Sequence, residues 1–145
     1  MNSKLPISPA KISSECYCFS LKKAARAVAR RYDDALRPYE LNNGQYSMLT
    51  TLAGFEQISI QKLGNFLEMD RTTATAALKP LQKRGLVAID QSEEDSRVRI
   101  VSITKAGKRV LASAMPAWSK VQKKISSMLL PEAGIELRQQ LDLLG

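Results

Sequence analysis

The feature that most constrains the fold of this chain is a change of hydrophobic period at Gly85. Before it, across residues 59–84, apolar side chains recur every three or four positions, which is the spacing of amphipathic helices. After it, residues 86–91 and 98–103 form two short runs rich in Val and Ile that flank a charged loop, a pattern typical of a β-hairpin. The chain is therefore expected to pass from short helices directly into a hairpin.

Two residues indicate where the helices before Gly85 begin. Ser59 can cap the first of them, whose expected inward residues are Ile60, Leu63, Phe66 and Leu67. Asp70 can cap the second, which is expected to run from Arg71 to Arg84 with Ala74, Ala77, Leu78 and Leu81 inward. Two short helices joined by a tight turn, the second one capped afresh, form the helix-turn-helix pattern.

The flanking segments predict further helices. Residues 14–37 form one amphipathic helix stopped by Pro38, and a turn at 42–44 precedes a short helix that ends near Gly54. The expected inward residues of the 14–37 helix are Cys18, Leu21, Ala25, Val28, Tyr32 and Ala35.

Three residues organise the C-terminal part. Thr104 can cap a long helix that Pro116 is expected to bend, and Pro131 is expected to open a last amphipathic helix. Val110, Leu111, Ala114, Trp118, Val121, Ile125 and Met128 are the expected inward residues of the long helix.

The expected fold class is mostly α with a small β-hairpin wing (α+β), in one domain spanning residues 1–145. Residues 42–104 form the winged helix-turn-helix lobe, and residues 8–37 and 105–145 form dimerisation helices. The terminal helices have more apolar face than a winged lobe of about 60 residues can cover, and a dimer interface buries such a surplus. The alternative is a closed monomer.

Charge narrows the class of partner. The 145 residues include 22 Lys and Arg against 14 Asp and Glu, which gives a formal net charge of +8. Positive charge favours polyanions, because each neutralised phosphate releases condensed counterions. Nucleic acid is therefore a candidate partner, although a basic surface alone also fits a protein that binds none.

Missing residue types narrow the class further. The chain has no histidine, which is the most common general base, and its two cysteines cannot form a four-ligand zinc site without other donors. With no phosphate-binding glycine loop or nucleophile elbow, we expect no enzyme, no metal and no cofactor. No apolar run reaches the ~20 residues that cross a bilayer, and no signal peptide is evident, so we expect a cytoplasmic protein without a membrane partner.

A β-hairpin that directly follows a helix-turn-helix is interpreted as a wing. Such a wing reaches across the phosphate backbone to the minor groove, where arginine inserts well if the groove is narrow. Arg97 is the first candidate for this contact and Arg99 the second. Asp95 is expected to hold the shape of the loop, through turn hydrogen bonds or by pairing with Arg97 or Arg99. The alternative is a solvated hairpin tip with incidental charge.

The second helix of the pattern supplies the other DNA candidates. Arginine can bind guanine through two hydrogen bonds, and threonine offers a hydroxyl and a methyl group to bases. Lysines further along the helix suit phosphates, as do groups at the start of the preceding helix. The base-contacting candidates are Arg71, Thr72, Thr73, Thr75 and Ala76, and the phosphate candidates are Lys79, Lys83, Ser59 and Gln61.

The stretch "MDRTTATAALKPLQKRGLVAIDQSEEDSRVRIVSITKAGKRVL", residues 69–111, resembles the winged helix-turn-helix core of the MarR family of bacterial transcriptional regulators. The matching pieces are Asp95-x-Arg97, "SITKAG" and "KRGLV", and "GQYSML" with the terminal helices extends the match over nearly the whole chain. The resemblance implies a homodimer with interlocked terminal helices. It also implies a regulator of transcription that binds a pseudo-palindromic operator in double-stranded DNA, with repression as the first expectation.

The resemblance also implies a signal that releases DNA. In many such proteins this is a small aromatic or lipophilic effector, bound in a cleft between the dimer core and the DNA lobes. Tyr32, Tyr46, Leu49 and Trp118 are the candidates to line that cleft here. Each also stands at an inward position, so core packing is the simpler role.

A thiol-based signal is the alternative. Cys18 follows the start of the first helix, with Phe19 next and Tyr32 about four turns on, and is similar in placement to the peroxide-sensing cysteine of organic-hydroperoxide sensors in the family. Lys22 departs from that pattern, which has a second tyrosine there, but lysine can lower a thiol pKa. A disulfide with Cys16 is not expected, and both cysteines can equally be inert. A winged helix that binds proteins instead of DNA is a third reading.

Overall fold

The computed structural model describes residues 5–144, so residues 1–4 and 145 of the expected single domain lie outside the described part. Helices account for most of it, and strands from the middle of the chain form a small antiparallel sheet, which confirms the predicted class. The elements in chain order are α1 (Pro9–Glu15), α2 (Tyr17–Leu36), η1 (Arg37–Tyr39), α3 (Asn43–Ala53), β1 (Ile58–Ser59), α4 (Ile60–Phe66), α5 (Arg71–Lys83), β2 (Val87–Gln91), β3 (Arg99–Ile103), α6 (Lys105–Ser126) and α7 (Ala133–Asp142).

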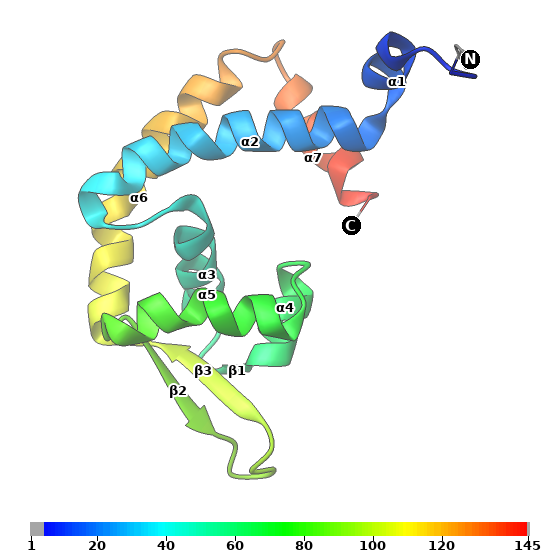
Figure 1. Ribbon diagram of the computed structural model, residues 1–145. Coiled ribbons are helices and arrows are strands. Elements are labelled where there is room, and N and C mark those ends of the chain that lie inside the picture. The colour runs from blue at the N-terminus through cyan, green and yellow to red at the C-terminus, as the bar shows by residue number, and fades with distance from the viewer. Residues whose placement is uncertain (1–4, 145) are drawn as a thin grey trace.

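The elements fall into two regions that α6 connects (Figure 1). At one end, α3, α4, α5 and the sheet form a lobe from which the β2–β3 hairpin projects, and at the other end α2 packs against α6. No helix among residues 5–144 is both long and apolar enough to cross a membrane.

The sheet has the strand order β1-β3-β2, with both pairings antiparallel. The predicted hairpin is confirmed, with Val87 opposite Ile103 and Gln91 opposite Arg99. The third strand, β1, was not predicted from the sequence, because two residues carry no periodicity. Its Ile58 pairs with Val101 and is buried, which anchors the start of α4 against the wing.

One hydrophobic core fills the winged lobe and continues to the end of α2. Burying a Leu or Val side chain contributes about 1.5–3 kcal/mol, so this core supplies much of the stability of the lobe. Its largest fully buried side chains are Leu36, Met48, Leu49, Leu52, Leu63, Leu78, Leu81 and Val101.

Side-chain caps begin the helices of the lobe. Ser59, Asp70 and Thr104 each accept a hydrogen bond from a backbone N–H in the first turn of the following helix, which confirms all three predicted caps. The predicted turn at 42–44 is wrong in part. Asn42 instead caps α3 in a capping box with Gln45, so the next two residues already belong to the helix.

The first helix also differs from its prediction. The expected 14–37 helix is interrupted at Cys16, whose extended backbone ends α1 and caps α2. Cys18, expected on a buried stripe, is exposed, and Leu21 and Val28 on the same stripe are also exposed. The apolar stripe exists, but within one chain nothing covers its first half.

Other predictions also need correction. Trp118 and Met128, expected inward on the long helix, are 37% and 59% exposed. Phe66, expected to point inward, is 64% exposed and packs edge-on against Phe55, with ring centroids 6.1 Å apart. The last helix begins at Ala133 and not at Pro131, because Glu132 adopts a left-handed backbone conformation that precedes the helix.

Two prolines lie inside helices. Pro116 lies in the middle of α6, and the ribbon of this helix changes direction along its length (Figure 1). That the bend falls at Pro116 stays a prediction. Pro80 lies in the last turn of α5, where it is exposed and removes a single backbone donor.

A tight joint connects the hairpin to α6. The Thr104 N–H donates to the carbonyl oxygen of Leu86 (3.0 Å), and its hydroxyl donates to that of Gly85 (2.7 Å). The same hydroxyl oxygen accepts from the Gly107 N–H (3.0 Å). A Cβ on Gly107 would lie 2.1 Å from the Leu86 oxygen and 2.8 Å from Cγ1 of Ile103. Only glycine lets α6 approach the hairpin this closely.

We expect Gly107→Ala to lower the free energy of unfolding by about 2–3 kcal/mol, because the added methyl group must separate α6 from the hairpin. Urea unfolding followed by circular dichroism measures the change. Gly44→Ala is the matched control, since its Cβ meets only Asn42 Oδ1 at 3.4 Å. Equal midpoints for the two variants would show that the joint is not rigid.

Candidate nucleic-acid interface

The predicted recognition helix, α5, has one buried and one exposed face. Ala74, Leu78 and Leu81 are buried against the lobe, which fixes the helix axially and in rotation. The exposed face carries predicted DNA-contacting residues at helical spacing, so their side chains lie along one line. These are Thr72, Ala76, Lys79 and Lys83.

The first turn of α5 is held by its capping residue. Asp70 accepts hydrogen bonds from the Thr73 N–H (2.8 Å) and the Thr73 hydroxyl (2.9 Å), and these bonds hold the pKa of the Asp70 carboxyl below its usual value. The Thr75 hydroxyl donates to the carbonyl oxygen of Arg71 (2.7 Å). Two of the three threonine hydroxyl protons are therefore already used within the helix, and these threonines can meet a base only as acceptors or through their methyl groups.

Two predicted backbone contacts lie at the start of α4. The Ser59 side chain accepts from the Lys62 N–H (3.1 Å), and the Gln61 amide donates to Asn65 (3.0 Å). Ser59 is half-buried and Gln61 is exposed. Both residues are oriented by local contacts within the first two turns of the helix.

The structure brings predicted site residues from three elements together in one small hollow of about 70 Å³. Ser59 and Gln61 come from the start of α4, Arg71 from the start of α5, and Arg97 and Arg99 from the wing. No carboxylate is among the residues that line it. Arg71 and Arg99 bring positive charge to this opening beside Arg97, whose own charge is balanced by Asp95, and such a surface suits phosphate or base oxygens.

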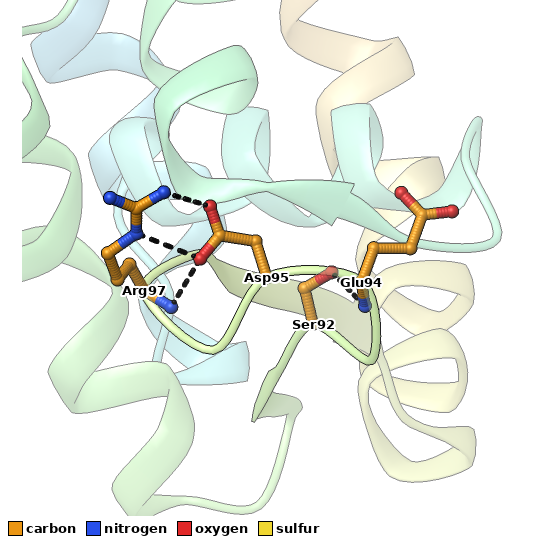
Figure 2. Close-up of polar contacts among 4 residues, drawn as sticks. All are labelled: Ser92, Glu94, Asp95 and Arg97. Atoms are coloured by element: carbon orange, nitrogen blue, oxygen red, sulfur yellow. Dashed lines mark hydrogen bonds and ion pairs between the residues drawn. The ribbon is translucent and has the colours of Figure 1, made fainter.

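The wing loop is shaped by one acidic residue (Figure 2). Asp95 accepts from the backbone N–H of Arg97 and, through both carboxylate oxygens, from its Nε and Nη2, each at 3.0 Å. These bonds hold the pKa of the Asp95 carboxyl below its usual value and raise the pKa of the Arg97 guanidinium. Asp95 thus pairs with Arg97, and Arg99, the other partner considered, projects from β3 opposite Gln91.

The rest of the loop is closed by backbone hydrogen bonds. The Val98 N–H donates to the carbonyl oxygen of Asp95 and the Ser92 N–H to that of Val98, both at 2.9 Å. The Ser92 side chain accepts from the Glu94 N–H (3.3 Å), as Figure 2 shows. Arg97 remains highly exposed at the tip, so its position is fixed by Asp95 and not by packing.

Sequence reasoning missed the role of Arg84. Its guanidinium donates to the carbonyl oxygens of Tyr39 and Glu40, which ties the end of α5 to the short segment after α2. Nothing in the sequence distinguishes Arg84 from the cations around it, because its partners are backbone groups about 45 residues away. Arg84 positions the recognition helix from its C-terminal end.

A second opening lies between α3 and α6, with a volume of about 510 Å³. Tyr46 and Trp118 line it and stack with ring centroids 6.2 Å apart. Tyr32 stacks on the other side of Trp118 at 6.4 Å and donates its hydroxyl proton to Gln122. Leu49, also proposed as a lining residue, is instead fully buried in the core. The remaining lining residues are Ser47, Thr50, Thr51, Met115 and Ser119.

The two cysteines are free and lie at the start of α2. Cys16 caps the helix by accepting from the Phe19 N–H at 3.4 Å, and Cys18 is exposed one turn before Lys22. Among the described residues, no group of three or more His, Cys, Asp and Glu side chains lies together in a way that could hold a metal ion.

Two short helices, the second of them the exposed and capped α5, followed by a hairpin with arginines at its loop end, define a winged helix-turn-helix protein. A model of the MarR family matches residues 41–98. This chain belongs to the MarR family.

Named relatives agree with this assignment. The organic hydroperoxide resistance transcriptional regulator of Bacillus subtilis is 32% identical over 90 residues, or 62% of this chain and 61% of that protein. The regulator SarZ of Staphylococcus aureus is 30% identical over 97 residues, or 67% and 66%. The chain thus spans just under two thirds of the length of these relatives. The solved structure of the M. tuberculosis transcriptional regulator MosR in complex with DNA is 29% identical, with a TM-score of 0.77 over 87% of this chain and 93% of that one.

The pairing of Asp95 with Arg97 predicts a pH dependence of wing order. Because the folded pKa of Asp95 is lowered, the pairing is fully present above the ordinary carboxyl value of about 3.9 and is lost as the pH falls through the lower folded value. An NMR titration of the Asp95 carboxyl carbon measures this. In Arg97→Gln, the same carboxyl is expected to titrate closer to its ordinary value. Identical titration curves for the parent and the variant would contradict the pairing.

Proposed function

We propose that this chain is a sequence-specific, double-stranded DNA-binding regulator of transcription that acts in the cytoplasm as a homodimer, and that it is a repressor released by a small aromatic or lipophilic ligand. The observation that carries the DNA-binding role is the hollow where Arg71, Arg97 and Arg99 meet the start of α4. Family membership and the DNA complex of MosR support it.

Each part of the interface has its own role in this proposal. The start of α5 enters the major groove, where Arg71 binds a guanine edge and Thr72, Thr73, Thr75 and Ala76 contact neighbouring bases. Lys79 and Lys83 neutralise phosphates further along the exposed face, and Ser59 and Gln61 anchor the backbone at the start of α4. Arg97, presented by Asp95, enters the minor groove, and Arg99 contacts the phosphates at its edge.

A homodimer is supported by the uncovered apolar surface of the terminal helices. Neither α1 nor α7 contains a buried residue, although both carry large apolar side chains. Leu21 on α2 and Ile135 on α7 are 37% and 57% exposed. A second chain that covers residues 8–37 and 105–145 would bury this surface and place two copies of α5 on a pseudo-palindromic operator. A closed monomer leaves the surface in water.

The opening between α3 and α6 is the proposed effector site. Tyr46 belongs to the winged lobe and Trp118 to the connecting helix, so a flat apolar ligand between them would change the angle between the two regions. A ligand can shift this equilibrium only as far as its affinities for the two arrangements differ. The hydroxyl groups of Thr51 and Ser119 offer hydrogen bonds to polar atoms of such a ligand, and that of Thr50, which already donates to the Tyr46 carbonyl oxygen, can accept one.

A thiol-based signal is the second candidate, because the Bacillus subtilis relative is named for organic hydroperoxide resistance. Cys18 is exposed, which gives an oxidant access to its sulfur. Lys22 follows one turn later on the same helix, and a nearby cation favours the thiolate. Cys16 is the other thiol and lies partly covered as the cap of α2.

The two kinds of DNA contact predict different effects of mutation. Arg71→Ala should weaken binding to the preferred sequence by about tenfold to a hundredfold and relax the choice at particular base pairs. Lys79→Ala should weaken binding to all sequences evenly and reduce the slope of affinity against salt by about one. Fluorescence anisotropy on the DNA upstream of the gene, with base-substituted duplexes, measures both. If neither substitution changes binding and binding does not depend on salt, the result would point to a protein partner instead of DNA.

Cys18→Ser separates the two candidate signals. If the thiol is the sensor, an organic hydroperoxide should release the parent from upstream DNA, a thiol reductant should restore binding, and the variant should not respond. If the cleft is the sensor, the oxidant leaves both proteins bound, and an aromatic acid should release both. Cys16→Ser is the matched control. Release of the variant by the oxidant would exclude Cys18 as the reactive thiol.

A further inference from the structure

The net positive charge of this protein does not come from its winged lobe. Residues 42–104 contain seven cations and seven anions, so the whole net charge of +8 comes from the flanking helices and termini. The cations of the lobe are Lys62, Arg71, Lys79, Lys83, Arg84, Arg97 and Arg99, and its anions are Glu56, Glu68, Asp70, Asp90, Glu93, Glu94 and Asp95. A second surface therefore carries the excess.

Four of the cations outside the lobe form a continuous line on α2. Lys22 and Lys23 are neighbours, and Arg26 and Arg30 follow at steps of three and four residues. All four are exposed, and together with Phe19 they line one hollow of about 340 Å³. We name these four residues the α2 stripe. At 1.5 Å per residue the stripe is roughly 12 Å long, with no carboxylate among the lining residues of its hollow.

The stripe has no ion-pair partner among the described residues. Within residues 5–144, the ion pairs join Arg37 to Asp34, Arg84 to Glu40 and Arg97 to Asp95, and none of them includes a stripe residue. Leaving four like charges side by side costs free energy through their mutual repulsion, which a polyanion removes.

The proposed dimer interface does not account for the stripe. Leu21 and Val28, seven residues apart, share one side of α2, and the stripe residues lie on another side of the helix. A two-fold interface that buried the stripe would bring two sets of four cations into low dielectric surroundings, where unpaired charges are costly. The stripe is therefore expected to face solvent in the dimer.

We propose that the α2 stripe is a second, sequence-independent binding surface for the phosphate backbone of double-stranded DNA. Each strand of a duplex places one phosphate every ~3.4 Å of the helix axis, so the stripe, laid along that axis, spans the rise of three or four phosphates of one strand. In Figure 1, α2 lies at the end of the molecule opposite the wing loop, so the segment bound by the stripe is not the one that α5 enters. The protein then holds two DNA segments at once.

This inference rests on the proposed DNA-binding function, and a bridging experiment separates the two. The upstream duplex is immobilised, the protein is loaded, and a labelled duplex of unrelated sequence is added at low salt. The parent is compared with K22Q/K23Q/R26Q and with the control K120Q/K123Q/K124Q, which removes the same charge from exposed sites on α6. Size-exclusion chromatography follows the oligomeric state, and anionic lipid vesicles replace the second duplex in a parallel arm.

We expect the parent and the control to capture the second duplex, and the stripe variant to lose at least tenfold of this capture. In the stripe variant, the slope of log affinity for the second duplex against log salt concentration should become shallower by ~2.7, which corresponds to three phosphates. Binding of the stripe variant to the immobilised duplex should stay within about twofold of that of the parent. If the parent itself does not bind the immobilised duplex, the proposed function is refuted instead.

Three results would overturn the inference. The first is no capture of a second duplex by a parent that is bound to the first. The second is an equal loss of capture in both triple variants, which would make the effect one of general charge. The third is a stripe variant that differs from the parent in another property. A changed oligomeric state would assign the stripe to a second copy of the chain, and changed vesicle binding with unchanged DNA capture would assign it to a lipid surface.

Discussion

The carbonyl oxygen of Leu86 accepts the Thr104 N–H while Gly107 packs directly against it, and this joint determines how α6 leaves the winged lobe. Thr104 ends the hairpin and caps α6 with the same side chain, so no flexible residue separates the wing from the long helix. The orientation of α5, which packs against β2, follows from the same contact. Every proposal about how DNA and effector sites communicate depends on this rigidity.

Two further contacts make the connection between the lobe and the helices continuous. Arg84 ties the C-terminal end of α5 to the backbone after α2, and Trp118 stacks between Tyr46 of α3 and Tyr32 of α2. The opening proposed for the effector lies at this aromatic stack. In the proposed dimer, a ligand inserted there would act on the three helices that this stack joins, and would change the spacing of the two recognition helices without unfolding either of them.

The sequence predicted those features that depend on neighbouring residues. The caps at Ser59, Asp70 and Thr104 and the hairpin are encoded within a few positions, and each occurs in the structure. Features set by distant segments could not be predicted, because periodicity shows that a side chain is apolar but not what covers it. Phe66 faces solvent beside Phe55, and Arg84 binds carbonyl groups that no local pattern identifies. The gathering of Arg71 with the wing arginines likewise needed β1, whose two residues give no signal.

The ion pair at the wing tip has a consequence for how the wing can distinguish DNA sequences. Asp95 and Arg97 together carry no net charge, so the tip gains little from the general attraction of the polyanion. Its guanidinium is already oriented, and insertion requires only that the groove be narrow enough to replace the water around it. In the proposed complex the wing would therefore respond to the width of the minor groove, and it would favour stiff A-tracts, which are narrow before any protein binds.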